Sequence, residues 1–230
     1  MSHRAGYNRI VQHLTDMFMK KTILFLAGLG LAFSALAQSP FTCTTEGAEL
    51  HYMTTDAKGN ESSTSVVKVQ KVKSAGETFS ITQETQLFIN GNAFTKPIVT
   101  TSTVRDGDVV VDFSGGLSLA AEGAGFVLPK RLATGLELPT GEVTVEVSGL
   151  KVKQDITFHK VVDKEELTVP AGTYECYVVE RQYTAKMMGI KVAGSMKTWY
   201  ARGIGAVKTD TYDKKGKLSS SQILTKVVMP

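Results

Sequence analysis

The stretch Glu142-Val143-Thr144-Val145-Glu146-Val147-Ser148 alternates valines with polar residues. In an extended strand successive side chains point to opposite faces, so the valines share one face and the polar residues share the other. Such alternation places one face in a core and the other in water. Residues 142–148 therefore predict one strand of a half-buried antiparallel sheet.

The same period of two recurs along the chain, for example at 65–70 and 173–180. Turn signals rich in Asp, Gly and Pro separate the runs, and Asp-Gly pairs favour tight hairpins. These signals lie at residues 56–60, 105–108, 149, 170–172, 188–189, 202–205 and 213–217. Counting the runs gives about ten to twelve strands. The sequence predicts an all-β protein, a single antiparallel meander that forms a curved sheet or a half-open barrel.

The segment 114–140 is the exception, since it is rich in glycine and contains Pro129 and Pro139. Residues 117–122 are its one helical candidate, and the flanking glycines favour a loop or a single turn there. We interpret the segment as a long connection. The alternative is a lid or a cavity lining, for which Phe126 and Leu128 are examples without being assigned to a site.

The chain has 230 residues, of which 42% are hydrophobic and 21% charged. This length allows one domain, or at most two small ones. The composition excludes a disordered chain, a collagen and a disulfide-dense mini-scaffold. Only one apolar run is long, which excludes a protein that crosses a membrane several times.

Residues 19–37 have the pattern of a secretory signal peptide. Lys20 and Lys21 form a basic start, an apolar run follows, and Ala35-x-Ala37 supplies the small residues of a cleavage site. We place the cut between Ala37 and Gln38. A membrane anchor is the alternative, but a spanning helix needs about 20 apolar residues. Gln38 stands where a lipoprotein would have cysteine, so we expect neither a lipid anchor nor a transmembrane anchor after processing.

Residues 1–18 precede a segment that already has a complete basic start at Met19. We interpret them as an extension that results from a mis-assigned start, or as a disordered extension; a longer signal peptide is the alternative. The predicted organisation is therefore an extension at 1–18, a signal peptide at 19–37 and a single β domain at 38–230. The expected location is the periplasm or the exterior of the cell.

Processing also changes the charge. The chain has 26 basic and 22 acidic residues, and removing the four basic and one acidic residues of 1–37 leaves 22 and 21. A nucleic-acid partner needs a clustered basic face, and none is visible in the sequence. We therefore expect no nucleic-acid partner.

Cys43 and Cys176 are the two cysteines of the chain. Both follow the signal peptide and would enter an oxidising compartment, which predicts a Cys43–Cys176 disulfide. Two free buried thiols are the alternative. A thiol-redox enzyme is disfavoured because no Cys-x-x-Cys motif is present.

The sequence offers no convincing catalytic or metal-binding constellation. His51 and His159 lack partners at ligand spacing, and a surface strand histidine is the expectation for each. Ser118 lies in a near match to a nucleophile elbow that lacks the second glycine. The neighbouring Glu165 and Glu166 are typical of a solvated loop. We therefore predict no enzyme, no catalytic residue, no metal site and no cofactor.

Three stretches carry a resemblance to a known family: Thr168–Tyr177, Ala185–Val192 and Trp199–Asp213. Together they resemble the TapB-like family of small secreted bacterial β proteins. The likeness covers roughly the whole of residues 38–230 and is strongest after residue 130. One departure is Arg202, where relatives often have proline. The resemblance implies a curved antiparallel sheet, similar to periplasmic lipoprotein-carrier domains, and it implies no activity.

These observations favour an exported non-enzymatic protein that binds a lipid or another apolar molecule on the concave face of its sheet. The ligand-binding residues stay unassigned. The alternative is a structural or protein-interaction module of the cell envelope, with a filled interior and an envelope protein as its partner. An enzyme with dispersed residues is a third hypothesis, which clustered titratable groups in a cleft would support.

Overall fold

The computed structural model describes residues 39–230 apart from 77, 95, 113–125, 148–149 and 188–189. The predicted signal peptide, its cleavage site and the upstream extension lie outside the described residues. Every regular element in the described part is a strand. The strands are β1 (Glu49–Asp56), β2 (Glu61–Ala75), β3 (Thr78–Ile89), β4 (Asn92–Ala93), β5 (Ile98–Arg105), β6 (Asp108–Asp112), β7 (Phe126–Leu128), β8 (Gly141–Val147), β9 (Leu150–Val169), β10 (Gly172–Met187), β11 (Ile190–Ala201), β12 (Gly205–Asp213) and β13 (Leu218–Val228).

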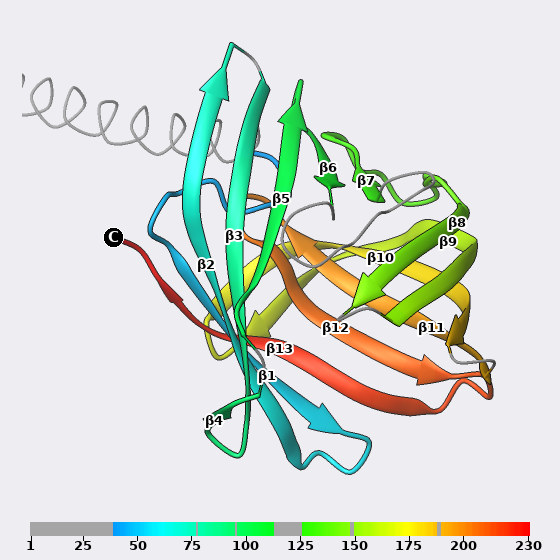
Figure 1. Cartoon of the computed structure of the whole chain (residues 1–230). Helices are drawn as coiled ribbons and strands as arrows, with labels where there is room; N and C mark the ends of the chain where they lie inside the picture. The colour runs from blue at the N-terminus through cyan, green and yellow to red at the C-terminus, as the bar shows by residue number, and fades with distance from the viewer. Residues whose placement is uncertain (1–38, 77, 95, 113–125, 148–149, 188–189) are drawn as a thin grey trace, which may run out of the picture. The chain divides into compact units, whose positions relative to one another are not determined.

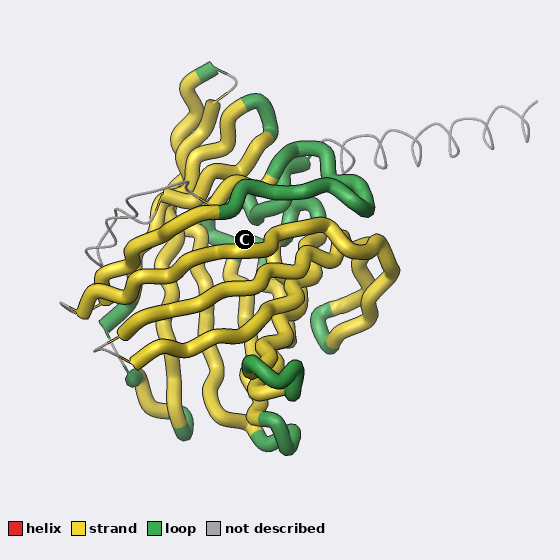
Figure 2. The backbone as a smooth tube through the Cα atoms, turned by 90° about the vertical axis from the view of Figure 1, so that its right-hand side faces the viewer, coloured by secondary structure: helices red, strands yellow, loops and turns green. Residues whose placement is uncertain are grey.

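All thirteen strands belong to one antiparallel sheet, in the order β7-β6-β5-β3-β2-β1-β13-β12-β11-β10-β9-β8, with β4 paired to β3 alone. The sheet stays open, because β7 and β8 are its outermost strands in the described part and do not pair with each other. The predicted fold class, an all-β curved sheet, is therefore confirmed, and a closed β-barrel is not formed. In Figure 1 the strands β2, β3 and β5 cross β10, β11 and β12 steeply, and Figure 2 shows from another side that two sets of strands run in different directions, so the sheet curves into two facing portions.

The two portions are joined by the first and last strands of the described part. β1 pairs with β2 on one side and with β13 on the other, and Leu50 lies opposite Val67 and Val227. Strands close in sequence form each portion, whereas the β1–β13 pairing connects opposite ends of the domain. One continuous sheet thus depends on a contact of very long sequence separation.

Two hairpins reuse the same turn chemistry. In the β1–β2 turn, Asp56 Oδ1 accepts hydrogen bonds from the backbone of Lys58 and Asn60, at 2.8 and 2.9 Å. In the β12–β13 turn, Asp213 Oδ1 accepts from Lys215 and Lys217, at 2.8 and 3.0 Å. A glycine with positive φ closes each turn, as Gly does where other residues would be strained. Residues 56–60 and 213–217 therefore form the same kind of local turn.

The Asp106-Gly107 pair also forms the tight turn that the sequence predicts. Both residues have positive φ, 53° and 90°, which is the conformation of a two-residue hairpin turn. Arg105 of β5 lies opposite Asp108 of β6, so the turn joins the two strands directly.

The hydrophobic core lies between the two portions of the sheet, because the alternating apolar faces of both point inward. Ile81 and Val104 come from β3 and β5, Val161 and Val179 come from β9 and β10, and all four belong to one buried cluster. The exposed fraction of these side chains does not exceed 3%.

The connection from β7 to β8 packs against the body of the domain. Leu132 and Leu138 are buried, and the backbone of Gly135 and Leu138 donates to the carbonyls of Val161 and His159 on β9. Residues 135–138 thereby extend the edge that β8 forms along β9. The segment 114–140, predicted as one long connection, differs in its described part: residues 126–128 form strand β7, and residues 129–140 form the connection to β8. Residues 113–125 lie outside the described residues.

The predicted disulfide is wrong for this structure, since Cys43 and Cys176 are free thiols. Both side chains are fully buried in the core. Burial raises the pKa of Cys43, and burial with the charges of Glu165 and Glu175 raises the pKa of Cys176 to about 12. The prediction rested on an even cysteine count and on the compartment, whereas a disulfide also requires a specific approach of the two side chains that a sequence does not show.

Candidate functional site

A pocket of about 440 Å³ opens on the concave side of the sheet. This volume lies in the range of small-molecule sites. Both portions of the sheet contribute to its walls, together with the segment that precedes β1. The lining residues are Phe41, Thr42, Leu50, Tyr52, Ser65, Val67, Gln83, Thr85, Thr100, Ser102, Val109, Leu128, Arg181, Tyr200, Ile204, Gly205, Ala206 and Gln222.

One wall of this concave pocket is polar because hydroxyl and amide side chains replace the apolar residues on the inner face of β2, β3 and β5. Gln83 lies opposite Thr100, two residues along the strands from the pair of Ile81 and Ser102. Ile81 belongs to the core and Gln83 lines the pocket, so the inner face of β3 changes from core to pocket within two residues. The Ser102 side chain is 6% exposed, and its hydroxyl has no hydrogen-bond partner among the described residues.

Arg181 brings a positive charge to the opposite wall. It lies on β10 between two irregularities in the β9–β10 register, at Val178/Val179 and at Gln182/Tyr183. Bulges of this kind re-aim side chains and bend the sheet. The guanidinium Nη2 donates to the sulfur of Met196 at 3.1 Å. A thioether is a weak acceptor, and this contact helps to position the Arg181 side chain.

Two tyrosines frame the pocket on the side of β1 and β11. The Tyr52 hydroxyl donates to the backbone oxygen of Ala206 at 3.0 Å and thereby ties β1 to β12. Burial raises the pKa of both Tyr52 and Tyr200, and the charge of Arg181 opposes that shift for Tyr200. Both phenols are therefore neutral at physiological pH.

A smaller cavity of about 140 Å³ adjoins the concave pocket. Arg181, Tyr200 and Ala206 line both spaces, so they form the boundary between them. The other lining residues of the smaller cavity are His159, Val179, Met196, Thr198 and Thr209. The hydroxyls of Thr198 and Thr209 lie 3.3 Å apart. The lining of this inner chamber therefore combines polar side chains with apolar ones.

His159 is part of this inner chamber, and the expectation of a surface strand histidine is wrong for it. Its side chain is 4% exposed, and Nδ1 lies 2.9 Å from the Pro139 carbonyl oxygen. Burial lowers the pKa of His159, and the charge of Arg181 acts in the same direction. Nδ1 donates to the carbonyl in the neutral ring. Strand alternation could not reveal this, because the connection that covers His159 is distant in sequence.

The segment before β1 contributes Phe41 and Thr42 to the lining of the concave pocket, and Arg202 holds this segment in place. The guanidinium donates to the carbonyl oxygens of Ser39 at 2.9 Å and Lys130 at 2.8 Å, and it stacks 4.4 Å from the centre of the Phe41 ring. Phe41 also meets Tyr177 edge to face. Arg202 therefore joins the amino-terminal segment to the β7–β8 connection, a role that sequence reasoning missed.

The other residues singled out in the sequence do not gather at the pocket. Cys43 and Cys176 line neither cavity. His51 pairs with Glu49 on β1 at 3.6 Å. Glu165 lies on β9, rather than in the expected loop, and accepts a hydrogen bond from the Trp199 indole. Leu128 does line the pocket, whereas Ala37, Gln38 and Ser118 lie outside the described residues.

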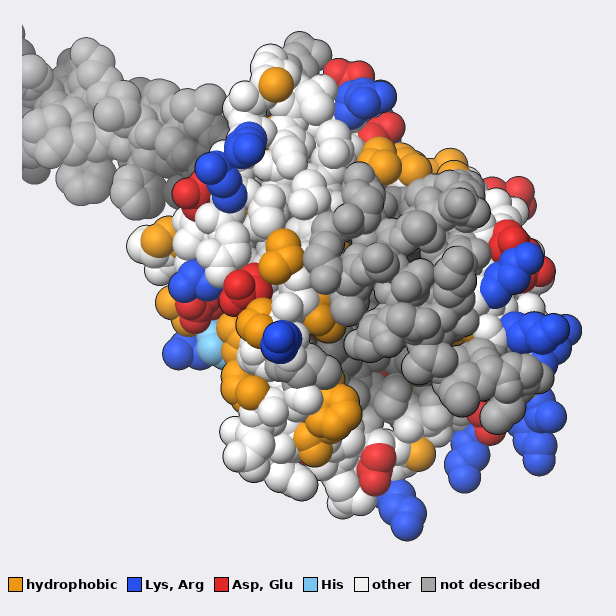
Figure 3. Space-filling model, in the orientation of Figure 1, with side chains coloured by type: hydrophobic (Ala, Val, Ile, Leu, Met, Phe, Trp, Pro, Cys, Tyr) orange, Lys and Arg blue, Asp and Glu red, His pale blue; other side chains and the backbone are white. Residues whose placement is uncertain are grey.

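Neither a metal centre nor a membrane-spanning helix is found in the described part of the chain. No three His, Cys, Asp or Glu side chains there are grouped so that they could hold a metal ion. No described helix has the length and apolar character needed to cross a membrane. On the face seen in Figure 3, Lys and Arg side chains lie along the rim and are interspersed with Asp and Glu.

These features define an open, single-sheet antiparallel β protein with a mixed polar and apolar pocket on its concave side. The chain belongs to the DUF3108-like family, which it matches over residues 45–224. The family model that matches is described as DUF3108-like and not as TapB-like, so the resemblance to the TapB-like family stays a prediction. No curated protein matches the chain.

Two solved structures share the fold. One is a protein from Bacteroides fragilis NCTC 9343 named as exported with a YmcC-like fold, with 16% identity and a TM-score of 0.71. The other is a protein from Parabacteroides distasonis ATCC 8503 named as a lipoprotein, with 19% identity and a TM-score of 0.71. Each likeness covers 83% of this chain and 99% of the other chain. At these identities the comparison establishes a common fold.

Proposed function

We propose that this chain is an exported, non-enzymatic protein of the bacterial envelope that binds a lipid or another largely apolar small molecule in its concave pocket. The observation that carries the proposal is the 440 Å³ pocket between the two portions of the sheet. Apolar side chains from β1, β2, β6 and β7 line it next to a polar wall. An apolar molecule gains free energy by leaving water for such a surface.

Two observations support an envelope location. Residues 19–37 have the pattern of a secretory signal peptide. The two proteins that share the fold are named as exported and as a lipoprotein. We expect the periplasm as the location, since Gln38 rather than cysteine follows the small residues of the cleavage site.

The pocket supports binding rather than chemistry. Its described lining contains serine, threonine and tyrosine hydroxyls but no carboxylate, thiol or histidine beside them that could act as a general base for a hydroxyl nucleophile. His159 lies in the inner chamber, next to Arg181 and two threonines, without a carboxylate among the lining residues. We therefore assign the site a carrier or sensor role in which the ligand leaves unchanged.

Native mass spectrometry of residues 38–230, purified from a bacterial periplasm, tests the proposal. We expect a discrete bound molecule that organic extraction releases and identifies. Thr100→Trp should abolish the bound mass, since Thr100 lines the pocket and an indole would fill it. Thr101→Trp is the matched control, because Thr101 is the next residue of β5 and points to the opposite face.

An unliganded mass for the wild-type chain, unchanged after incubation with envelope lipids, would overturn ligand binding. A second candidate would then stand, namely an interaction module of the envelope. Large apolar side chains at the surface favour it: Phe94, next to β4, is 63% exposed, and Val192 is 49% exposed. The open edges β7 and β8 also leave backbone groups accessible to a partner strand in the described part.

A further inference from the structure

The boundary between the two cavities is the most specific chemical feature of the pocket. Arg181, Tyr200 and Ala206 line both the larger space of about 440 Å³ and the smaller one of about 140 Å³. A molecule that fills the larger space therefore meets the Arg181 side chain at its inner end. What lies at this boundary decides which polar group such a molecule can carry.

The charge at the boundary is positive. Arg181 is the one residue with a fixed charge among the described residues that line either cavity, and no Asp or Glu lines them. Arginine presents a planar fork of donors that matches a carboxylate with two parallel hydrogen bonds. Its Nη2 donates to the thioether of Met196, and a carboxylate oxygen is a far stronger acceptor than that sulfur.

A second observation comes from the facing wall. Ser102 of β5 is 6% exposed, lines the larger cavity, and its hydroxyl has no hydrogen-bond partner among the described residues. A buried hydroxyl without a partner is unfavourable, and a polar group that enters the pocket removes that cost. Gln83 and Thr100, its neighbours on the same wall, supply further donors.

The pocket also offers apolar surface to a hydrocarbon. The apolar lining residues include Phe41, Leu50, Val67, Val109, Leu128 and Ile204. Polar side chains such as those of Ser65, Thr85 and Gln222 line the same space. A pocket with both kinds of lining suits a molecule that has a polar end and an apolar body.

We propose that the ligand is an amphiphile with a carboxylate at its polar end, bound by Arg181 and reached by the Ser102 hydroxyl across the pocket. This inference rests on the proposed function and adds the charge of the ligand to it. A single arginine balances a single negative charge. A carboxylate is therefore preferred to the neutral alcohol of the same chain and to an alkyl phosphate, which carries more than one charge near neutral pH.

The test compares ligands that share one hydrocarbon chain. Dodecanoate, dodecanol, dodecyl phosphate and dodecylamine are titrated below their micellar concentrations into residues 38–230, and binding is followed by isothermal calorimetry. We expect dodecanoate to bind about 10- to 100-fold more tightly than dodecanol, as one charge-assisted pair allows. Dodecylamine should bind most weakly, because Arg181 repels it.

Variants separate this inference from the proposed function. Arg181→Gln should lower the affinity for dodecanoate by a much larger factor than the affinity for dodecanol; Arg131→Gln, an exposed arginine outside both cavities, is the control. Ser102→Ala should fold normally, since it removes an unpaired hydroxyl, and should weaken dodecanoate more than dodecanol. Each comparison is made between two ligands on one variant, so a general loss of stability does not imitate the result.

Equal affinities of the wild-type chain for dodecanoate and dodecanol would overturn the carboxylate and leave the proposed function standing. The same holds if dodecyl phosphate binds most tightly, or if Arg181→Gln weakens both ligands equally. Binding of none of the four ligands would overturn this inference, while a different molecule released from the periplasmic protein would still support the proposed function.

Discussion

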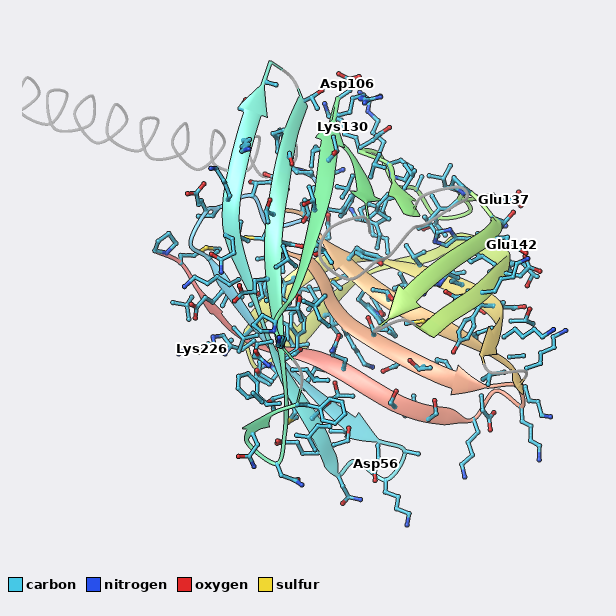
Figure 4. All side chains as sticks on the ribbon, in the orientation of Figure 1. Asp56, Asp106, Lys130, Glu137, Glu142 and Lys226 are labelled. Atoms are coloured by element: carbon cyan, nitrogen blue, oxygen red, sulfur yellow. The ribbon has the colours of Figure 1, made fainter. Side chains whose placement is uncertain are left out.

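At the level of single residues, Arg202 holds together several segments of the chain, and the sequence did not predict this role. Its guanidinium contacts the Ser39 carbonyl, the Lys130 carbonyl and the Phe41 ring. It thereby fixes the amino-terminal segment and the β7–β8 connection to the β11–β12 turn. Figure 4 shows Lys130 near Asp106, at the end of the molecule where β5 turns into β6.

Arg202→Gln should lower the free energy of unfolding by about 2–4 kcal/mol, because two charge-assisted hydrogen bonds and a cation–π contact are lost. Urea denaturation of residues 38–230 measures the loss. Arg202→Lys keeps the charge without the planar fork and should recover only part of it. A change below about 0.5 kcal/mol for Arg202→Gln, typical of a surface substitution, would contradict this role.

At the scale of the element, the hairpin turns are the features that residue order specifies most directly. Asp56 and Asp213 each accept two backbone hydrogen bonds from their own turn. The hydrogen bonds hold the pKa of both carboxyls below the usual value. Asp56 lies at the tip of the β1–β2 hairpin, far from Asp106 and Lys130 (Figure 4). Such turns set the register of the strands that they join.

The double variant Asp56→Asn, Asp213→Asn tests this coupling of the turns to pH. A pKa lowered by folding means that the ionised carboxylates stabilise the fold above the unfolded pKa of about 3.9. That contribution is lost as the pH falls through the lower, folded pKa. We therefore expect the wild type to be more stable than the variant near pH 7, with a gap that narrows in acid.

Chemical denaturation of both proteins at a series of pH values measures this gap. Asp155→Asn, an exposed residue of β9 outside the turns, is the matched control and should show a smaller gap. A gap between wild type and double variant that stays constant from neutral to acid pH would show that the carboxylate charge does not stabilise these turns.

At the scale of the whole molecule, the β1–β13 pairing makes one sheet of two meanders. Leu224 of β13 lies opposite Tyr52 of β1 and is fully buried. The core that spans the two portions and the pocket between them both depend on this junction. A destabilising substitution at the junction should therefore lower the stability of both portions together.

Leu224→Ala should lower stability by about 2–5 kcal/mol, the usual cost of emptying a filled core position. Hydrogen exchange should show the loss equally at the slowest amides of β2–β3 and of β10–β11, since one cooperative sheet unfolds as a unit. Leu136→Ala, at an exposed position, should change neither set. Loss of protection confined to β12 and β13 would mean that the two portions unfold independently.

The local predictions succeeded where neighbouring residues decide the outcome. The Asp106-Gly107 turn, the strands at 65–70 and 173–180, and the turns at 56–60 and 213–217 follow from alternation and turn chemistry. The disulfide, the exposed His159 and the loop at Glu165 failed, because each depends on what another part of the chain places beside that residue. The pocket itself had one hint, the apolar residues around Leu128, and no sequence signal marked Arg181 as its charged group.

The residue order was enough to predict a curved antiparallel β sheet, because the period of two and the spacing of the turns are properties of neighbouring residues. It did not show that β1 joins β13, or that Arg181 and Ser102 line one pocket from strands far apart in sequence. Turn and strand preferences act over a few residues, whereas pairing of distant strands and the burial of a polar group are settled only when the whole core packs.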